Sequence, residues 1–317
     1  SEIGWAAGEM GTILRTDDGG RTWSMQIQGN GYSLRKGFFL SGSEGWAVGD
    51  DGIVLYTNSG GKSWKLQDSG TEGRLLGVRV TEGSLGWGWM MTGDGEVLFT
   101  MTRGREWKFQ KDQKIRPLRQ YRLTDSQFIS LSEGWAVGGN GVIIHNVDGG
   151  KIWETQESPT EGRLNAVNFP GYGTGWVVGD GGILLRGAVD GMVWGFLNAG
   201  TGLDLLGVDF TSPFDGWVVG QSGLIVHSEN AGTSWHAQQS DVSVDLYDVE
   251  FINGDEGYAV GDGGTIIHTI DGGNTWIMQE SSTTNDLYDI SLAPDGGLWI
   301  IGEWGIILKH KSAQQPS

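Results

Sequence analysis

A repeat of about 41 residues constrains this chain more than any other feature of its sequence. Strings of the type Gly-Trp-Ala-Val-Gly recur along its length, each with an aromatic residue at the same place. A second aromatic series follows eighteen residues after the first, with the same spacings of 41, 43 and 46 residues. Because the spacings of the two series change together from copy to copy, the chain is a tandem array of one structural unit. The first series is Trp5, Trp46, Trp89, Trp135, Trp176, Trp217, Tyr258 and Trp299, and the second is Trp23, Trp64, Trp107, Trp153, Trp194, Trp235 and Trp276.

Each repeat contains the pattern of four short strands. An inner strand such as 205–210 precedes the Gly-Trp-Val-Val-Gly segment, and a glycine-rich turn then leads to an apolar third strand such as 224–228. The fourth strand begins at the tryptophan of the second series. Four strands in about 41 residues predict the blade of an all-β propeller, with the aromatic residues packed between neighbouring blades.

The number of blades depends on how the incomplete copies are counted. Second and third strands occur eight times, whereas first and fourth strands occur seven times. Ser1 and Glu2 match the pair that precedes Trp135, so the printed chain begins inside a blade. We therefore expect eight blades, with the first inner strand missing or supplied otherwise, and seven blades as the alternative. Residues 1–311 would form a single propeller domain, followed by a polar tail at 312–317.

Composition excludes several other classes of protein. The 57 glycines follow no collagen period, and 16 tryptophans are too many for a disordered chain. No cysteine is present, which excludes disulfides and thiolate metal sites. No apolar run is long enough to span a membrane. The net charge of −18 disfavours a nucleic-acid partner.

A turn motif lies between the third and fourth strands of each repeat. Thr16–Trp23 reads Thr-Asp-Asp-Gly-Gly-Arg-Thr-Trp, and similar strings end at Trp153 and Trp276. The motif resembles the Asp-box, or BNR repeat, of sialidases and related propellers. Its aspartate is replaced by Ser59, Thr102, Val189 and Asn230 in other copies, so we expect a structural turn and no metal or catalytic role. The structural Asp-box residues are Asp18, Gly20, Trp23, Asp148, Gly150, Trp153, Asp271, Gly273 and Trp276.

The whole repeat, GWAVGxxGxIxxTxxGGxxW, is similar to that of the photosystem II stability and assembly-factor propellers and their relatives in non-photosynthetic bacteria. The resemblance covers essentially the whole chain. It implies a non-catalytic scaffold that binds a partner protein during assembly of a membrane complex, in a periplasmic, thylakoid-lumenal or otherwise exported location. It implies no cofactor. Photosynthetic members of that family are seven-bladed and carry an arginine-rich patch, whereas this chain is more regular and much more acidic.

The largest break in the repeat is a basic segment at 103–122. The interval from Trp107 to Leu123 is 16 residues, against 11 in the other copies, and the segment holds eight basic residues against two acidic ones. Arginine pairs with carboxylates in a bidentate manner, so a basic loop suits an acidic protein segment, with a solvated surface loop as the alternative. With two arginines that precede inner strands, the predicted partner-binding set is Arg74, Arg103, Arg105, Lys108, Lys111, Lys114, Arg116, Arg119, Arg122 and Arg163.

The residue before each inner-strand leucine shows a second pattern. Arginine occupies this position in three consecutive repeats and aspartate in the next three. Because equivalent positions lie at one rim of a ring, we expect a rim that is basic on one side and acidic on the other, unless the runs reflect blade duplication. The residues are Ser33, Arg74, Arg122, Arg163, Asp204, Asp245 and Asp286.

No catalytic residues or metal ligands emerge from the sequence. His145, His227 and His268 occupy the same third-strand position of different repeats, so they should lie apart. The spacing does not gather the arginines, tyrosine and glutamate of a sialidase. The alternative to a scaffold is a propeller that binds or hydrolyses glycans, for which a pair of carboxylates in a groove would be needed.

Overall fold

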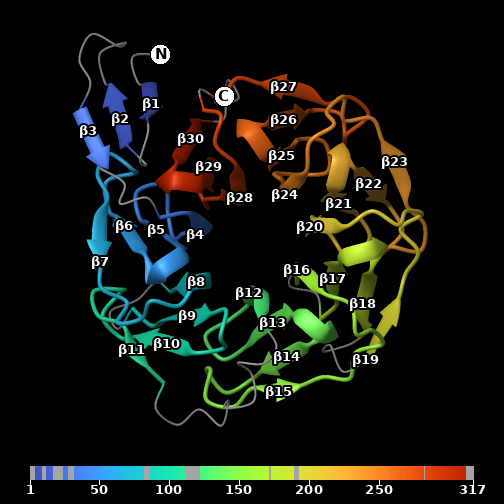
Figure 1. The fold of residues 1–317 in the computed structure, drawn as a ribbon, viewed down its shortest axis with the longest axis horizontal. Coiled ribbons are helices and arrows are strands. Elements are labelled where there is room, and N and C mark those ends of the chain that lie inside the picture. Colours follow the sequence, from blue (N-terminus) through green and yellow to red (C-terminus); the bar gives the residue numbers. More distant parts are fainter. Residues whose placement is uncertain are drawn as a thin grey trace.

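The chain folds into a ring of antiparallel sheets around a central axis (Figure 1). The computed structural model describes residues 4–8, 12–16, 24–27, 32–81, 86–110, 122–170, 173–188, 193–281 and 283–311. The predicted tail at 312–317 lies outside the described residues. The inner strands are β4 (Leu34–Phe39), β8 (Leu75–Val80), β12 (Leu123–Phe128), β16 (Leu164–Asn168), β20 (Leu205–Phe210), β24 (Leu246–Phe251) and β28 (Leu287–Leu292).

The second and third strands form the middle of each sheet. They pair in antiparallel register, as in the alignment of Trp217 with His227. The second strands are β1 (Gly4–Gly8), β5 (Gly45–Gly49), β9 (Gly88–Thr92), β13 (Gly134–Gly138), β17 (Gly175–Gly179), β21 (Gly216–Gly220), β25 (Gly257–Gly261) and β29 (Gly297–Gly302). The third strands are β2 (Thr12–Thr16), β6 (Val54–Thr57), β10 (Val97–Thr100), β14 (Ile143–Asn146), β18 (Leu184–Ala188), β22 (Ile225–Ser228), β26 (Ile266–Thr269) and β30 (Ile307–Lys311).

The outer strands are short, and from residue 65 onward their side chains are mostly exposed. They are β3 (Ser24–Ile27), β7 (Lys65–Gln67), β11 (Lys108–Phe109), β15 (Glu154–Thr155), β19 (Val193–Phe196), β23 (His236–Gln238) and β27 (Ile277–Gln279). Single 3-10 turns join second to third strands: η2 (Asp50–Gly52), η4 (Gly139–Gly141), η5 (Asp180–Gly182), η6 (Gln221–Gly223), η7 (Asp262–Gly264) and η8 (Glu303–Gly305). Glycine ends each of these turns because a Cβ at Gly182, for example, would lie 2.2 Å from the carbonyl oxygen of Thr201.

Aromatic side chains fill the interfaces between blades, as the two series predict. Trp217 stacks on Phe251 of the next inner strand, with ring centroids 3.5 Å apart. Trp276 of the second series meets the same Phe251 edge-on at 5.8 Å. These rings are at most 6% exposed, and burial of such large side chains supplies much of the core. The same stacked and edge-on pair recurs around Phe39, Phe169 and Phe210.

The ring has seven blades, so the expectation of eight is wrong. β28 packs directly against β4, where the backbone N–H of Gly37 donates to Asp289 Oδ2 at 2.9 Å and Trp299 stacks on Phe39 at 4.2 Å. Seven inner strands therefore close the ring, because a sheet without an inner strand cannot reach the axis. The surplus copy, β1–β2–β3, forms a separate three-stranded sheet beside the ring (Figure 1). The seventh blade, β28–β30, has three described strands.

Candidate partner-binding face and central channel

Two cavities of about 540 and 530 Å³ occupy the axis of the ring. Lys36, Asp125, Ala166 and Asp248 line both, so the cavities are two ends of one channel. Each inner strand shifts register against its neighbour between its first and third residues. Such bulges redirect side chains, and here the channel is lined by third and fifth residues of the inner strands.

Carboxylates at the third position join neighbouring blades across the channel wall. Asp125 Oδ2 accepts the N–H of Val167 at 2.9 Å, and Asp248 Oδ2 accepts that of Ile290 at 3.1 Å. Asp289 accepts the N–H of Gly37 on β4 in the same way, where the last blade meets the first. Because inner-strand edges would otherwise leave these N–H groups unpaired, the carboxylates satisfy buried donors.

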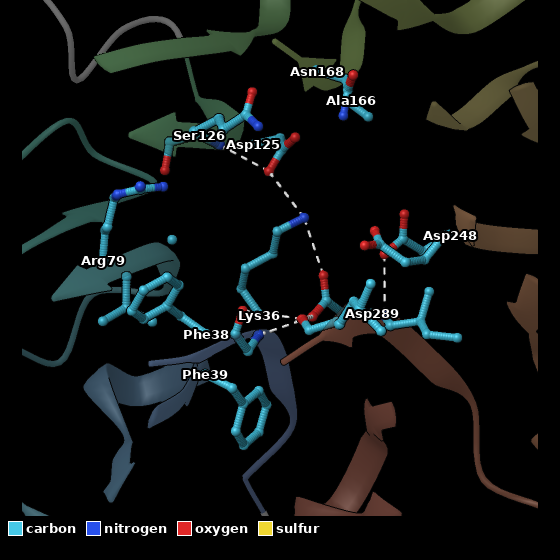
Figure 2. A pocket seen from close by; sticks show the side chains of 18 of the residues that line it. Lys36, Phe38, Phe39, Arg79, Asp125, Ser126, Ala166, Asn168, Asp248 and Asp289 are labelled. Carbon is cyan, nitrogen blue, oxygen red and sulfur yellow. Dashed lines mark hydrogen bonds and ion pairs between the residues drawn. The ribbon is translucent and has the colours of Figure 1, made fainter. Parts of the chain in front are cut away.

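Lys36 lies among these carboxylates (Figure 2). Its Nζ is 3.0 Å from Asp289 Oδ1 and 3.9 Å from Asp125 Oδ1. Burial opposes the charge on Lys36, but the carboxylates of Asp289, Asp125 and Asp248 outweigh it and raise its pKa well above the ordinary value. Lys36 therefore stays charged and balances part of the acidic wall.

The carboxyls on the β20 and β24 side of the channel have raised pKa values. Burial raises the pKa of Asp209 to about 6, against hydrogen bonds from Phe251, Phe210 and Asn168 that lower it. Burial likewise raises the pKa of Asp248 well above its ordinary value, although Lys36 opposes this. For Glu250, burial and the nearby carboxylates of Asp209 and Asp248 act in the same direction. These carboxyls therefore keep their protons to a higher pH than ordinary carboxyls do.

The residues that precede the inner strands lie at one end of the channel. Antiparallel pairing puts them beside the 3-10 turns, and we call this end the 3-10 face; the opposite end, with the Asp-box turns, is the Asp-box face. Arg74, Arg163, Asp204 and Asp245 line the same 530 Å³ cavity. The predicted rim, basic on one side and acidic on the other, therefore exists at the 3-10 face.

The two halves of this rim differ in how their charges are used. Asp204, Asp245 and Asp286 each accept a backbone N–H from the 3-10 turn of the preceding blade, at 2.7, 2.9 and 2.9 Å. Arg74 instead donates to Asp50 at 2.8 Å, and its side chain is 53% exposed. Arg122 and Arg163 are exposed. The acidic half thus stabilises turns, whereas the basic half presents its charge to solvent.

The predicted basic segment is divided between both ends of the ring. Arg103 and Arg105 lie in the turn between β10 and β11, at the Asp-box face, where Arg103 pairs with Glu44 at 2.8 Å. Lys108 lies on outer strand β11. Arg122 lies at the 3-10 face, with Arg74 and Arg163. The remaining members fall outside the described residues: Lys111, Lys114, Arg116 and Arg119.

The Asp-box residues act within their own turns. Asp148 Oδ1 accepts the N–H groups of Lys151 and Ile152 at 3.0 and 2.9 Å. Burial alone would raise its pKa, but these bonds and the Asn146 amide lower it. In the eroded copies Ser59, Thr102 and Asn230 keep an oxygen that accepts the N–H four residues later. Gly150 and Gly273 have φ values of 80° and 84°, and Trp153 and Trp276 are buried; Asp18, Gly20 and Trp23, like Val189, lie outside the described residues.

The three repeated histidines lie on three different blades. Each Nε2 contacts an acid of its own blade, as in His227 with Asp215 at 2.7 Å. His145 and His227 also stack on the first-series tryptophans of their blades, Trp135 and Trp217. Among the described residues, no three side chains of a kind that binds metals are grouped to hold an ion.

Sequence reasoning missed the channel residues Lys36, Arg79, Asp125 and Asp289. The signal was present, because Lys36, Asp125 and Asp289 stand at the third inner-strand position, where other repeats have a small residue such as Gly207 or Ala166. Arg79 stands at the fifth position. The signal was missed because an inner-strand side chain reads as core until a bulge turns it toward the axis.

A family model described as "Photosynthesis system II assembly factor YCF48" matches residues 1–71, 68–188, 187–278 and 233–315. No curated protein sequence was found to match. Within the described residues, no helical segment has the length and hydropathy to cross a bilayer.

Solved structures with the same fold include two described as YCF48. One, "YCF48 bound to D1 peptide", is 21% identical, with a TM-score of 0.76 over 89% of this chain and 94% of that one. A second, from Cyanidioschyzon merolae, is 18% identical, with a TM-score of 0.74 over 88% and 95%. The GH74 xyloglucanase from Xanthomonas campestris is 13% identical, with a TM-score of 0.68 over 95% of this chain and 57% of that chain. At these identities the likeness concerns the fold alone.

Proposed function

Because the chain belongs to the family of the photosystem II assembly factor YCF48, we propose that it is a non-catalytic scaffold for a partner protein during assembly of a membrane complex. The similar structure named "YCF48 bound to D1 peptide" supports a peptide segment as the form in which the partner binds. The family supports a protein partner in preference to a nucleic acid. An exported location, periplasmic or thylakoid-lumenal, belongs to the same proposal.

The observation that carries this proposal is the basic half of the rim at the 3-10 face. Arg74, Arg122 and Arg163 stand on three consecutive blades and are exposed. A guanidinium binds a carboxylate through two parallel hydrogen bonds, so three in a row suit an extended acidic segment. The acidic half of the rim, with Asp204 and Asp245, repels such a segment and so sets its direction across the channel mouth.

A charge-reversal experiment tests this face. The triple variant Arg74→Glu/Arg122→Glu/Arg163→Glu should lose a stoichiometric partner that the wild type retains in quantitative pull-downs from native membrane and soluble extracts. The matched control is Lys62→Glu/Lys65→Glu/Lys151→Glu, which makes the same charge change at exposed residues in or directly after the Asp-box turns. The control should retain the partner.

Two outcomes would count against the proposal. Equal recovery of one partner by all three proteins would show that the 3-10 face is not the docking face. Loss of the partner by both variants would indicate a general dependence on net charge. Circular dichroism and thermal unfolding of each variant establish that the ring is intact before binding is compared.

A further inference from the structure

Arg79 on β8 is a channel cation without a balancing carboxylate. It lines the 540 Å³ cavity, where its guanidinium lies 5.7 Å from the ring centroid of Phe38. No carboxylate among the described residues forms an ion pair with it, and burial lowers its pKa with no acid opposing the change. Lys36, in the same channel, has two carboxylates within 4 Å. Of these two cations, Arg79 is therefore the one free to bind an external anion.

Ser126 on β12 contributes an unused donor on the same wall. Its side chain is 3% exposed, and its hydroxyl has no hydrogen-bond partner among the described residues. Its backbone N–H bonds Asp125 Oδ1 at 2.9 Å. Figure 2 shows the Ser126 hydroxyl and the Arg79 guanidinium directed toward the same part of the cavity. A buried hydroxyl without a partner is unfavourable, so a ligand oxygen that accepts from it is stabilised.

Gly77 on β8 explains why the interface between β8 and β12 has hydrogen-bond donors but no carboxylate to accept from them. It holds the third inner-strand position, where Asp125 and Asp248 place a carboxylate against the next blade. A Cβ at Gly77 would lie 2.5 Å from Ser126 Oγ, so the hydroxyl occupies the space of the missing side chain. The β8–β12 interface thus lacks the bridging carboxylate found in other interfaces.

We propose that Arg79, Ser126 and Gly77 form a binding site for the carboxylate group of a small ligand. One carboxylate oxygen accepts from the Arg79 guanidinium, and the other accepts from the Ser126 hydroxyl beside Gly77. The site lies inside the channel toward the Asp-box face, away from the arginine rim, so it is independent of the proposed docking function.

The remaining charges of the channel favour a single negative charge on the ligand. Lys36 neutralises one of the two charges of Asp125 and Asp289, so this pair keeps a net negative charge. Asp248 and Glu250 have raised pKa values and carry protons over a wider pH range than free carboxyls. Asp209, with a pKa of about 6, adds negative charge at neutral pH. A monoanionic carboxylate is therefore accommodated better than a doubly charged phosphate.

Nuclear magnetic resonance of the arginine side chains tests the site with acetate as the probe. The Nε–Hε signal of Arg79 is identified by its absence in Arg79→Gln. This signal should shift saturably as acetate is added, and it should not respond to acetamide, which has the same shape without the charge. Ser126→Ala should weaken acetate binding by about tenfold, the effect of one hydrogen bond to a charged group. Ser132→Ala, at an exposed serine of the same blade, should leave the affinity unchanged.

Three results would overturn the proposal. A linear shift shared by all arginine signals would indicate a general salt effect. An equal response to acetamide would show that the charge is not recognised. Tighter binding of inorganic phosphate than of acetate at neutral pH would contradict the argument for a single charge. Chemical-shift dispersion of each variant verifies its fold. Arg79→Lys, read at the backbone amide signal of Ser126 because the arginine signal is lost, is a conservative second variant that should retain weak acetate binding.

Discussion

Two neighbouring interfaces share the β24–β27 blade and differ in how they are filled. Between β20–β23 and β24–β27, Trp217 stacks on Phe251, and Trp276 meets that ring edge-on. Between β24–β27 and β28–β30, Tyr258 replaces the tryptophan, and Leu292 stands where the phenylalanine would be. The second interface is aliphatic apart from Tyr258, and no second-series tryptophan belongs to it among the described residues.

The difference shows that two blades can stack without the set of stacked and edge-on aromatic rings, which we call the aromatic wedge. Tyr258 is still 4% exposed, and it stacks on His268 of its own blade with centroids 4.1 Å apart. Aliphatic residues of β28 and β29 fill the rest of this interface. Burial of apolar area is the common requirement, and the aromatic geometry adds to it.

The largest expected effect comes from removing the central ring of each interface. Trp217→Ala should lower the free energy of unfolding by about 4 kcal/mol, because it removes a fully buried indole and leaves a cavity. Tyr258→Ala should cost clearly less, about 2 kcal/mol, because fewer aromatic contacts are lost. Urea unfolding followed by tryptophan fluorescence and circular dichroism measures both. Equal losses would mean that the two interfaces contribute alike despite their different packing.

A pH experiment probes the channel side of the aromatic interface, where Asp209 Oδ2 accepts the N–H of Phe251 at 2.9 Å. The folded pKa of Asp209 is about 6, above the ordinary value of about 3.9. Between these values the folded state binds more protons, so stability falls as pH rises from about 4 to about 6. Asp209→Asn cannot titrate and should be more stable than wild type by about 3 kcal/mol at pH 7.5, with little difference at pH 4.

Denaturant unfolding of both proteins at several pH values measures this difference. A constant offset between wild type and Asp209→Asn across the range would contradict the assignment of the titration to Asp209. The Asp271→Asn variant serves as the control, because hydrogen bonds within its turn lower the pKa of that carboxyl, the opposite direction from Asp209.

The smallest expected effect comes from rebuilding the stacked aromatic pair in the interface between β24–β27 and β28–β30. Tyr258→Trp and Leu292→Phe should each change stability little on their own. Together they should recover a coupling of about 1 kcal/mol, because a stacked aromatic pair is favoured beyond its area. A double-mutant cycle in urea measures the coupling. An additive result would show that the second-series tryptophan is needed to hold the stack.

Much of the fold could be predicted from sequence because each blade repeats its own landmarks. The strand pattern, the Asp-box turns and the position of the aromatic residues follow from local chemistry, and the structure confirms them. The blade number could not be derived in this way. It depends on whether Asp289 meets Gly37, a contact between residues 252 positions apart that leaves no local signal.

The candidate sites were predictable only in part, for a related reason. Arg74, Arg163, Asp204 and Asp245 recur at the same position of successive repeats, so their clustering at one rim could be inferred. Arg79, Ser126 and Gly77 come from two blades, and their significance lies in hydrogen bonds that are not made. A sequence pattern records which groups are present, but it does not record which of them lack a partner.

The contact between Asp289 and Gly37 also has a consequence for how the ring forms. Contacts between distant parts of a chain are slow to make, because the entropy of closing a long loop must be overcome first. Blades can stack on one another in order of synthesis, but the flank of β4 has no neighbour until β28 and β29 exist. The face of Phe39 that Trp299 covers in the finished ring therefore stays uncovered until the last blade has formed. The nascent ring has two open apolar ends, and ring closure is the step that removes both of them together.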